Sequence, residues 1–276
     1  MMYKIAAIVL AVLSGLLVAP ASATATTGSP AVFIIPHQDD EALIMGSAIQ
    51  THVMANRPVW LVLVTDGAGS GVRGILSDRY GVSLTPAEFS AARDREFAAS
   101  AALLGVPADH IIYEHVPDGG VTDTVALNVV DELYARFGPT ASYATTSWLD
   151  VQPDHRTLGS ALNHRAVLGP IADARFYQFQ RYWSKVPTPT YGYYQSTDQL
   201  AILKDQINYG DWDPSNGRYS IGMLSVPRDF ARLVSDPRSK WHMPNNAWKS
   251  EADRQAAAAW ITKCYPTPTP YDCMDH

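Results

Sequence analysis

The first two-thirds of the chain alternates short continuous apolar runs with segments of helical period. Strands are predicted over residues 32–35, 58–64, 111–114 and 141–146, and the continuous apolar run over residues 58–64 is typical of a strand covered on both faces. Apolar positions at helical spacing follow them, over residues 42–53, 85–104, 125–137 and 156–168. This alternation favours an α/β fold with three layers, a Rossmann-like, mostly parallel sheet flanked by helices.

Local signals set the ends of several predicted helices. Thr85, Pro86 and Glu88 form the pattern of a capping box with proline in the first turn, which predicts a helix start. Gly105 and Gly138 follow the last apolar positions of two helical segments and predict their ends.

Polar side chains gather where the first strand ends. His37, Asp39, Asp40 and Glu41 directly follow residues 32–35. Side chains that leave the carboxyl ends of strands in an open α/β sheet converge in a crevice. Three acids beside a histidine repel one another unless they share a cation or a proton, so the pattern indicates a divalent metal site. The alternative is that Asp39 or Asp40 only caps the next helix, but a cap needs one acceptor and several are present.

The strand over residues 141–146 ends in a similar way, with Asp150, Asp154 and His155 before a helix. His155 is therefore the candidate to join His37 and one carboxylate. Two imidazoles and one carboxylate are a usual protein ligand set of catalytic zinc, which leaves a position for water. The same set suits non-haem iron, so Fe2+ or another divalent metal stays open as the alternative.

Two further strand ends carry candidate substrate contacts. Residues 65–71 are rich in glycine, but no Gly-Lys-Ser follows and the spacing does not match a dinucleotide fingerprint. We interpret the segment as a rim loop that brings Asp66 near the crevice. His115 and Asp118 follow the strand over residues 111–114 and are predicted to line the pocket. The other central histidines, His52, His110 and His164, are interpreted as packed or surface residues.

The motifs at these strand ends resemble those of a known family. Residues 36–41, Pro-His-Gln-Asp-Asp-Glu, resemble the Pro-His-Pro-Asp-Asp-Glu motif of the LmbE-like (PIG-L) zinc-dependent N-acetylglucosaminyl deacetylases. Residues 152–155, Gln-Pro-Asp-His, resemble the downstream His-Pro-Asp-His motif of that family. The 65–67 loop, Arg93-x-x-Glu96 and residues 104–106 resemble the region between them. The resemblance covers roughly residues 32–168.

Carried over residue by residue, the resemblance implies one zinc ion held by His37, Asp40 and His155. It implies Asp39 as the general base that takes a proton from the attacking water, and it implies an acetamide as the attacked group. Arg93 and Asp118 match family positions that contact substrate hydroxyls. From their places at strand ends, we add three substrate-binding candidates: Asp66, His115 and Asp150.

Two residues depart from the family motifs. Gln38 replaces a proline, which changes the stiffness of the loop but removes no ligand. Gln152 replaces a histidine that holds the oxyanion or protonates the leaving amine in the family. A glutamine amide donates a hydrogen bond but does not transfer a proton at neutral pH, so Gln152 stays a catalytic candidate only as a donor. The departure motivates an alternative, a sugar-binding protein with a metal site and weak or no deacetylase activity.

Residues 1–23 have the pattern of a signal peptide. Lys4 precedes an apolar segment over residues 5–18, and Ala21-Ser22-Ala23 is a small-x-small cleavage site. An uncleaved membrane anchor is the competing interpretation, because the apolar run approaches the length of a bilayer span. We expect cleavage near Ala23, secretion, and no stable membrane insertion of the mature chain.

Residues 24–276 are expected to form a single domain. Its motif-bearing core covers residues 30–170, and an aromatic-rich covering region follows over residues 171–276. Cys264 and Cys273, the two cysteines of the chain, are predicted to form a disulfide because they lie close together in an exported protein. The net charge of −6 and the lack of a basic block argue against nucleic acid as a partner. The sequence carries no signal for oligomeric state.

The covering region is rich in aromatic residues. Eleven of the 28 aromatic residues of the chain fall between residues 176 and 219. Either they pack over the sheet edge or they form a platform on which sugar rings stack, with Asp211, Asp213 and Asn216 as hydrogen-bonding neighbours. One further helix is predicted near residues 251–262.

Together these features predict an exported zinc-dependent hydrolase that removes the acetyl group from an N-acetylated amino sugar. Export favours an extracellular glycan, an oligosaccharide or a glycosylated natural product as the substrate.

Overall fold

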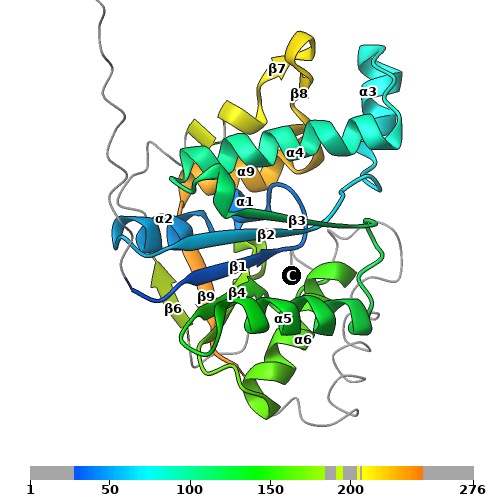
Figure 1. Cartoon of the computed structure of the whole chain (residues 1–276). Helices are drawn as coiled ribbons and strands as arrows, with labels where there is room; N and C mark the ends of the chain where they lie inside the picture. The colour runs from blue at the N-terminus through cyan, green and yellow to red at the C-terminus, as the bar shows by residue number, and fades with distance from the viewer. Residues whose placement is uncertain (1–27, 184–190, 195–203, 206, 245–276) are drawn as a thin grey trace, which may run out of the picture.

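The structure is a computed structural model in which residues 28–183, 191–194, 204–205 and 207–244 are described (Figure 1). The predicted signal peptide, the helix expected near residues 251–262 and both cysteines lie outside the described residues. Within them, no helix combines the length and the apolar character needed to cross a membrane.

Seven strands form one mixed sheet in the described part of the chain. Its parallel part runs β3 (Ile111–Val116), β2 (Val59–Thr65), β1 (Ala31–Ile35), β4 (Ser142–Thr146) and β5 (Ala174–Gln178). Two antiparallel strands extend the β5 edge, first β9 (Ser239–His242) and then β6 (Tyr191–Tyr194). A separate two-stranded ribbon joins β7 (Trp212–Asp213) to β8 (Arg218–Tyr219).

Helices cover both faces of this sheet, so the predicted three-layer α/β fold is confirmed (Figure 1). One face packs against α1 (Asp40–Leu43), α2 (Gly46–Met54), α4 (Pro86–Leu103) and α9 (Pro227–Ser235). The other face packs against α5 (Asp123–Phe137) and α6 (Pro153–Leu168). Two short helices, α3 (Val72–Tyr80) and α8 (Ile221–Ser225), pack on α4.

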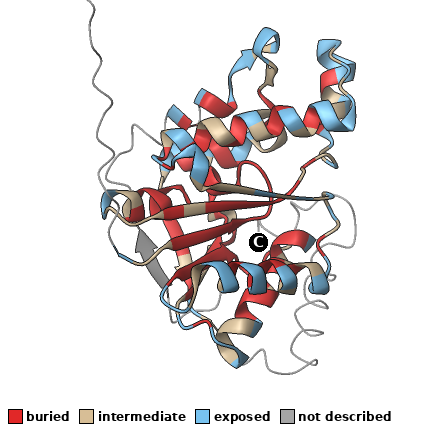
Figure 2. Ribbon diagram, in the orientation of Figure 1, coloured by how far each residue is buried: buried red, intermediate tan, exposed pale blue. Residues whose placement is uncertain are grey.

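The central strand β1 is apolar along its whole length, as expected of a strand whose two faces are both covered. Phe33 and Ile35 of β1 pack toward α1, α2 and α4, whereas Val32 and Ile34 pack toward α5 and α6. Figure 2 shows the same contrast, with buried strands and with helices that expose their outer faces. The continuous apolar runs in the sequence therefore correctly predicted a sheet covered on both faces.

The strand order places a crevice between β1 and β4. β2 and β3 extend the sheet from one side of β1, whereas β4 and β5 extend it from the other. Side chains at the carboxyl ends of two strands that part in this way project into a gap that no crossover helix fills. The register pairs Ala31 with Ser142 and Phe33 with Ala144, so the residues after Ile35 and after Thr146 reach the same edge.

Three helices differ from the sequence prediction. The segment predicted as one helix over residues 42–53 is two helices, because Met45 leaves helical geometry (φ −116°, ψ −4°) before Gly46 begins α2. The helix α3 was not predicted, since only Val72 and Leu76 are buried on it and glycines precede it. The helix α6 begins at Pro153 rather than Arg156, because the Gln152 side chain accepts a hydrogen bond from the His155 amide and proline occupies the first turn.

Packing explains most of the described aromatic residues after residue 174. Six of them are buried, at Phe176, Tyr177, Phe179, Tyr182, Tyr209 and Phe230. Trp212 is 40% exposed and its ring contacts Tyr80 and Tyr219. The idea of a stacking platform therefore remains a prediction for this small group, and Tyr191, Tyr193 and Tyr194 carry no described side chains.

Candidate metal centre and active site

Three ligand atoms meet at the crevice between β1 and β4. His155 Nε2 lies 3.0 Å from His37 Nδ1 and 3.0 Å from Asp40 Oδ2, and the last two atoms are 3.5 Å apart. Ligand atoms around a tetrahedral zinc ion lie roughly 3.3 Å from one another, given metal–ligand bonds of about 2.0–2.1 Å. The three atoms therefore have the spacing of a metal site, and all three residues are buried while also lining a pocket.

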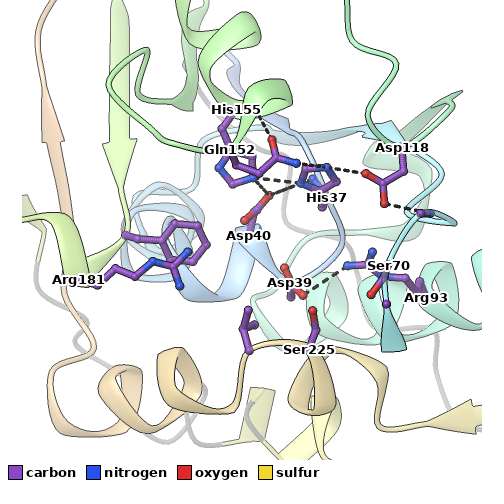
Figure 3. Close-up of a pocket in the computed structure, with 14 residues that line it drawn as sticks. His37, Asp39, Asp40, Ser70, Arg93, Asp118, Gln152, His155, Arg181 and Ser225 are labelled. Carbon is purple, nitrogen blue, oxygen red and sulfur yellow. Dashed lines mark hydrogen bonds and ion pairs between the residues drawn. The ribbon is translucent and has the colours of Figure 1, made fainter. Parts of the chain in front are cut away.

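The folding of residues 36–43 explains how His37 and Asp40 reach the same point. β1 ends at Ile35, and the chain turns so that the His37 amide donates to Asp40 Oδ2 at 3.0 Å. Asp40 then begins α1, and its carboxylate turns back toward the imidazole. His155 arrives from the first turn of α6, after β4. Figure 3 shows the three side chains converging on one point of the pocket.

Carboxylates hold the far nitrogen of each imidazole. Asp150 Oδ2 lies 3.3 Å from His155 Nδ1 and is fully buried. Asp154 Oδ2 and Asp118 Oδ1 lie 3.1 and 3.2 Å from His37 Nε2. Metal-binding histidines usually donate their second N–H to a carboxylate, which fixes the tautomer that leaves the other nitrogen free for the ion. The surroundings of both imidazoles therefore fit a metal site.

The pKa shifts show that this cluster favours positive charge. Burial opposes protonation of His155, but the charges of Asp40 and Asp150 raise its pKa to about 9. For His37, burial also opposes protonation, but the hydrogen bonds that its imidazole donates to Asp118, Asp154 and Asp40 raise the pKa well above its ordinary value. Burial disfavours the charged form of Asp40 too, yet the charge of His155 lowers its pKa. A bound cation satisfies the same carboxylates without protons on the imidazoles.

Asp39 lies beside the triad but is not one of its three potential metal ligands. It precedes α1 as the N-cap residue, but its side chain makes no capping hydrogen bond, which argues against the capping interpretation. Its backbone has φ 102°, a conformation that residues other than glycine rarely adopt and that recurs at functional sites. Its carboxylate lines the pocket and lies 3.4 Å from Arg93 Nη2. Burial raises the pKa of Asp39 well above its ordinary value, against the opposing charge of Arg93.

Glu41, the third acid of the motif, turns away from the pocket. Its Oε1 accepts hydrogen bonds from Ser100 and Tyr209, and the Ser100 hydroxyl also lies 3.0 Å from Asp205 Oδ2. Burial raises the pKa of Glu41 to about 8 and that of Asp205 to about 7. Because one hydroxyl hydrogen cannot serve both carboxyl groups, a proton on one of them satisfies the pair.

Gln152 lies beside the triad, and both polar atoms of its side-chain amide make contacts within the site. Its Oε1 accepts a hydrogen bond from the His155 amide at 3.1 Å and caps α6, and its Nε2 lies 3.3 Å from His37 Nε2. It lines the pocket beside the triad. The residue that replaces the family histidine therefore helps to place both imidazoles of the triad.

The pocket encloses about 350 Å³ and brings together only some of the predicted substrate residues. Arg93 and Asp118 line it. Arg93 also donates to the carbonyls of Gly67 and Gln38, and Asp118 bridges His37 to the Gly69 amide.

The other three predicted substrate residues do not line the pocket. Asp150 is buried behind His155. Asp66 Oδ1 accepts from the amides of Ala68 and Asp118 and shapes the loop between them. His115 points outward, with its side chain 54% exposed and paired with Asp94. The reason is that alternate residues of a strand end face opposite sides, so the end of a strand does not by itself place a side chain in the crevice.

Other residues of the pocket carried no sequence motif. Phe179, Arg181, Ser225 and Val226 form a further wall of the pocket. Figure 3 shows Ser225 across the pocket from His37 and His155. The ring of Phe179 stacks on His155 with centroids 5.8 Å apart, and the Arg181 guanidinium lies 4.2 Å from the centre of that ring. Arg181 is paired with Asp229. The aromatic enrichment after residue 174 was the available signal for this wall, but it did not single out Phe179 or indicate the arginine.

The remaining described histidines have ordinary environments. His52 contacts Arg57, His110 bonds to the Val59 carbonyl and stacks on Trp60, and His164 is exposed. Among the residues that the structure describes, neither potential metal-binding group contains any of them. The second group shares His37 with the triad and adds Asp118 and Asp154.

One comparison with known proteins concerns the sequence. The family model described as GlcNAc-PI de-N-acetylase (PIG-L) matches residues 32–166, which include the triad and Asp39. A search of curated protein sequences finds no match.

Solved structures show related folds. A triple mutant of the deacetylase in the teicoplanin biosynthetic pathway has a TM-score of 0.59 at 15% identity, and the match covers 79% of this chain and 99% of that one. The zinc-inhibited form of teicoplanin deacetylase Orf2 has a TM-score of 0.57 at 15% identity, covering 74% and 90% of the two chains.

Two further similar structures differ from each other in chemistry. N,N'-diacetylchitobiose deacetylase from Pyrococcus horikoshii, in complex with an inhibitor, has a TM-score of 0.54 at 18% identity over 79% of this chain and 84% of that one. The 4-carboxy-2-hydroxymuconate hydratase from Pseudomonas putida has a TM-score of 0.50 at 15% identity, with 75% and 88% covered. At such identities the likeness shows the fold alone, and the residues of the site must decide the reaction.

Proposed function

Because this chain belongs to the PIG-L family through residues 32–166, we propose that it is a metal-dependent hydrolase that removes the acetyl group from an N-acetylated amino sugar. The observation that carries the proposal is the triad of His37, Asp40 and His155 with the free carboxyl of Asp39 beside it in one pocket. The triad offers three ligands for one ion. Asp39 is not one of these ligands, so its carboxylate is available as a base.

Zinc is the proposed metal. The donor set of two imidazoles and one carboxylate, with carboxylates behind both imidazoles, fits zinc. A structurally similar deacetylase has a zinc-inhibited form. When bound, a zinc ion supplies Lewis acidity for the amide carbonyl and lowers the pKa of water. Ferrous iron accepts the same donors, so elemental analysis of protein purified without added metal decides between them.

Asp39 is the residue proposed to carry out both proton transfers of the reaction. Asp39 takes a proton from the water whose oxygen attacks the acetamide carbon. When the C–N bond breaks, Asp39 returns a proton to the leaving nitrogen, and the products are acetate and a free amino sugar. Burial raises the pKa of Asp39, which brings the carboxyl closer to a pH at which it can both accept and return a proton.

The substitution at Gln152 shapes this scheme. Its Oε1 is engaged in capping α6, and its Nε2 amide is too weak an acid to transfer a proton at neutral pH, so the proton for the leaving amine comes from Asp39. The alternative, a sugar-binding protein without turnover, predicts metal binding but no acetate release, even at high enzyme concentration. If Gln152→His raises the rate of acetate release, the glutamine limits activity in the natural chain.

We propose an N-acetylated carbohydrate as the substrate, in an extracellular glycan, an oligosaccharide or a glycosylated natural product. Two proteins of similar fold are a deacetylase in the teicoplanin biosynthetic pathway and an N,N'-diacetylchitobiose deacetylase. Their substrates support an N-acetylated carbohydrate as the substrate class here. Arg93 and Asp118 are the proposed contacts for sugar hydroxyls, since both line the pocket. Arg181 and Ser225 are added on the further wall of the pocket.

The test is an acetate-release screen with N-acetylglucosamine, its oligomers and other N-acetylated glycans. We expect release that a chelator abolishes and that added zinc restores, and loss of release in Asp39→Asn. Stoichiometric binding of a sugar without any acetate release would instead support the sugar-binding alternative.

Export and a Cys264–Cys273 disulfide remain proposals from the sequence. Expression of the full chain in a secreting host tests both together. We expect a mature protein that starts near Thr24 and whose two cysteines resist alkylation until a reductant is added. Retention in the cell with an intact N-terminal segment would favour the membrane anchor instead.

A further inference from the structure

A buried polar network reaches the active-site loop from the side opposite the pocket. Glu41 Oε1 lies 2.5 Å from the Tyr209 hydroxyl and 2.5 Å from the Ser100 hydroxyl. The Ser100 hydroxyl also lies 3.0 Å from Asp205 Oδ2. All four residues are fully buried, so each hydrogen bond acts without competition from water.

The network ends at the backbone of Asp39. The second carboxylate oxygen of Glu41, Oε2, accepts a hydrogen bond from the Asp39 amide at 3.1 Å. Asp39 needs such support because its φ of 102° is unfavourable for an aspartate and no side-chain cap stabilises it. On its other side, Arg93 donates to the Gln38 carbonyl at 2.6 Å. The peptide group between Gln38 and Asp39, which carries the proposed base, is thus held at both its carbonyl and its N–H.

Two members of the network come from the covering region. Tyr209 and Asp205 lie outside residues 32–166, the part of the chain that matches the family. The Tyr209 ring packs on Phe230 with centroids 5.3 Å apart. It also fits against Gly222, where an added Cβ would lie only 2.4 Å from the ring. These contacts leave the hydroxyl little freedom to move away from Glu41.

We propose that Tyr209 and Ser100 are positioning residues for the general base. They orient the Glu41 carboxylate, and Glu41 holds the Asp39 amide so that the Asp39 side chain faces the pocket. The role of Asp39 as the base that these residues position rests on the proposed deacetylase function. Neither residue touches the pocket, and neither is a neighbour of the triad ligands in the sequence.

The primary test is Tyr209→Phe, which removes the hydroxyl and keeps the ring. We expect kcat for acetate release to fall about tenfold, since small displacements of a catalytic group cost up to about 100-fold. KM and zinc content are expected to stay unchanged, because the pocket wall and the triad are intact. An unchanged kcat in a folded, zinc-loaded variant would overturn the proposal.

The chain offers a matched control in Tyr143. This tyrosine is also buried, and its hydroxyl donates to the Gly138 carbonyl at 2.8 Å, away from the pocket. Tyr143→Phe therefore loses a comparable hydrogen bond, and we expect kcat to change less than twofold. Equal losses of kcat in the two variants would show that the effect is a general loss of packing, and the positioning role would be rejected.

A second measurement tests the network without turnover. Hydrogen exchange of a peptide covering residues 35–45 reports on the Asp39 amide. We expect faster exchange of this peptide in Tyr209→Phe and in Ser100→Ala than in Tyr143→Phe. If the wild-type protein releases no acetate from any glycan, the proposed function fails while exchange still reports on the network. If exchange in this peptide is the same in all three variants, the network does not hold Asp39 and the inference fails even with an active enzyme.

Discussion

Residues 32–166 and the described residues after them contribute to the same pocket in different ways. The first region supplies the triad and the proposed base, all from segments that follow the ends of β1 and β4. The second region supplies the wall with Phe179, Arg181, Ser225 and Val226, and the buried support with Asp205 and Tyr209. The proposed ligands and base therefore come from segments that follow strand ends, whereas the further pocket wall and the buried network come from segments that return over the sheet.

This contrast has a physical basis. Adjacent parallel strands bring their following residues to one edge by backbone hydrogen bonding alone, so their reactive groups need few further contacts. The wall depends on side-chain packing between distant segments, such as Phe179 on His155 and Tyr209 on Phe230. Changes in the first region are therefore expected to abolish chemistry, and changes in the second region to alter binding, positioning or stability.

The largest expected effect is in the first region, at Asp39. Asp39→Asn keeps the size of the side chain but removes its ability to accept a proton, so kcat is expected to fall by about 10²–10⁴-fold. Zinc content is expected to remain at the wild-type level because Asp39 is not one of the three ligands. Steady-state acetate release and elemental analysis check both statements. Acetate release at the wild-type rate in this variant would refute the assignment of the base.

The next largest effect is expected behind the triad. Asp150→Asn removes the negative charge that faces His155 Nδ1, and zinc affinity is expected to fall about 10–100-fold. Competition with a fluorescent chelator measures this affinity directly. Asp173→Asn serves as the control, since Asp173 is an exposed partner of Arg175. If both variants bind zinc equally well, Asp150 does not tune the metal site.

In the second region, Arg181→Gln tests whether the wall contacts substrate. Asp229 keeps its partner Arg232 at 3.1 Å, so the variant leaves no buried charge unpaired. We expect KM to rise about fivefold with little change in kcat, as for the loss of one contact made equally in ground and transition states. Arg165→Gln, which breaks the exposed Arg165–Asp131 pair, is the control. A fall in kcat without a change in KM would instead give Arg181 a role in the chemical step.

The smallest expected effect concerns stability and His242 of β9. Burial lowers the pKa of His242 from 6.5 to about 4. Below pH 6.5 the unfolded chain takes up a proton that the folded chain does not, so this stabilisation is complete above pH 6.5 and is lost as the pH falls toward 4. Between pH 7.5 and 5.5 the loss is about 1.4 kcal/mol.

Urea unfolding at the two pH values measures this loss. We expect the difference in unfolding free energy between the wild-type protein and His242→Asn to change by this amount between the two pH values, because the contributions of His52 and His155, whose pKa shifts have opposite signs, are the same in both proteins. An identical pH slope in the variant and the wild-type protein would show that His242 is not the source.

The sequence by itself determined the fold class and the chemistry of the triad. The strands and the polar residues that follow them are visible in the sequence pattern. His37, Asp40 and His155 are brought together by strand order rather than by detailed packing. The sequence also indicated a role for Asp39 beyond helix capping. The motif contains three acids, and a helix cap requires only one of them.

Only the tertiary structure decided what the other polar residues do. Asp66, Asp118 and Asp150 follow strands and His115 lies near the end of β3, yet only Asp118 of the four lines the pocket, because side-chain direction depends on the local backbone. Glu41 differs from Asp39 by two positions but faces a buried tyrosine from the covering region. The Glu41–Tyr209 contact joins residues 168 positions apart through packing of the covering region against the sheet, and no local pattern in the sequence encodes it.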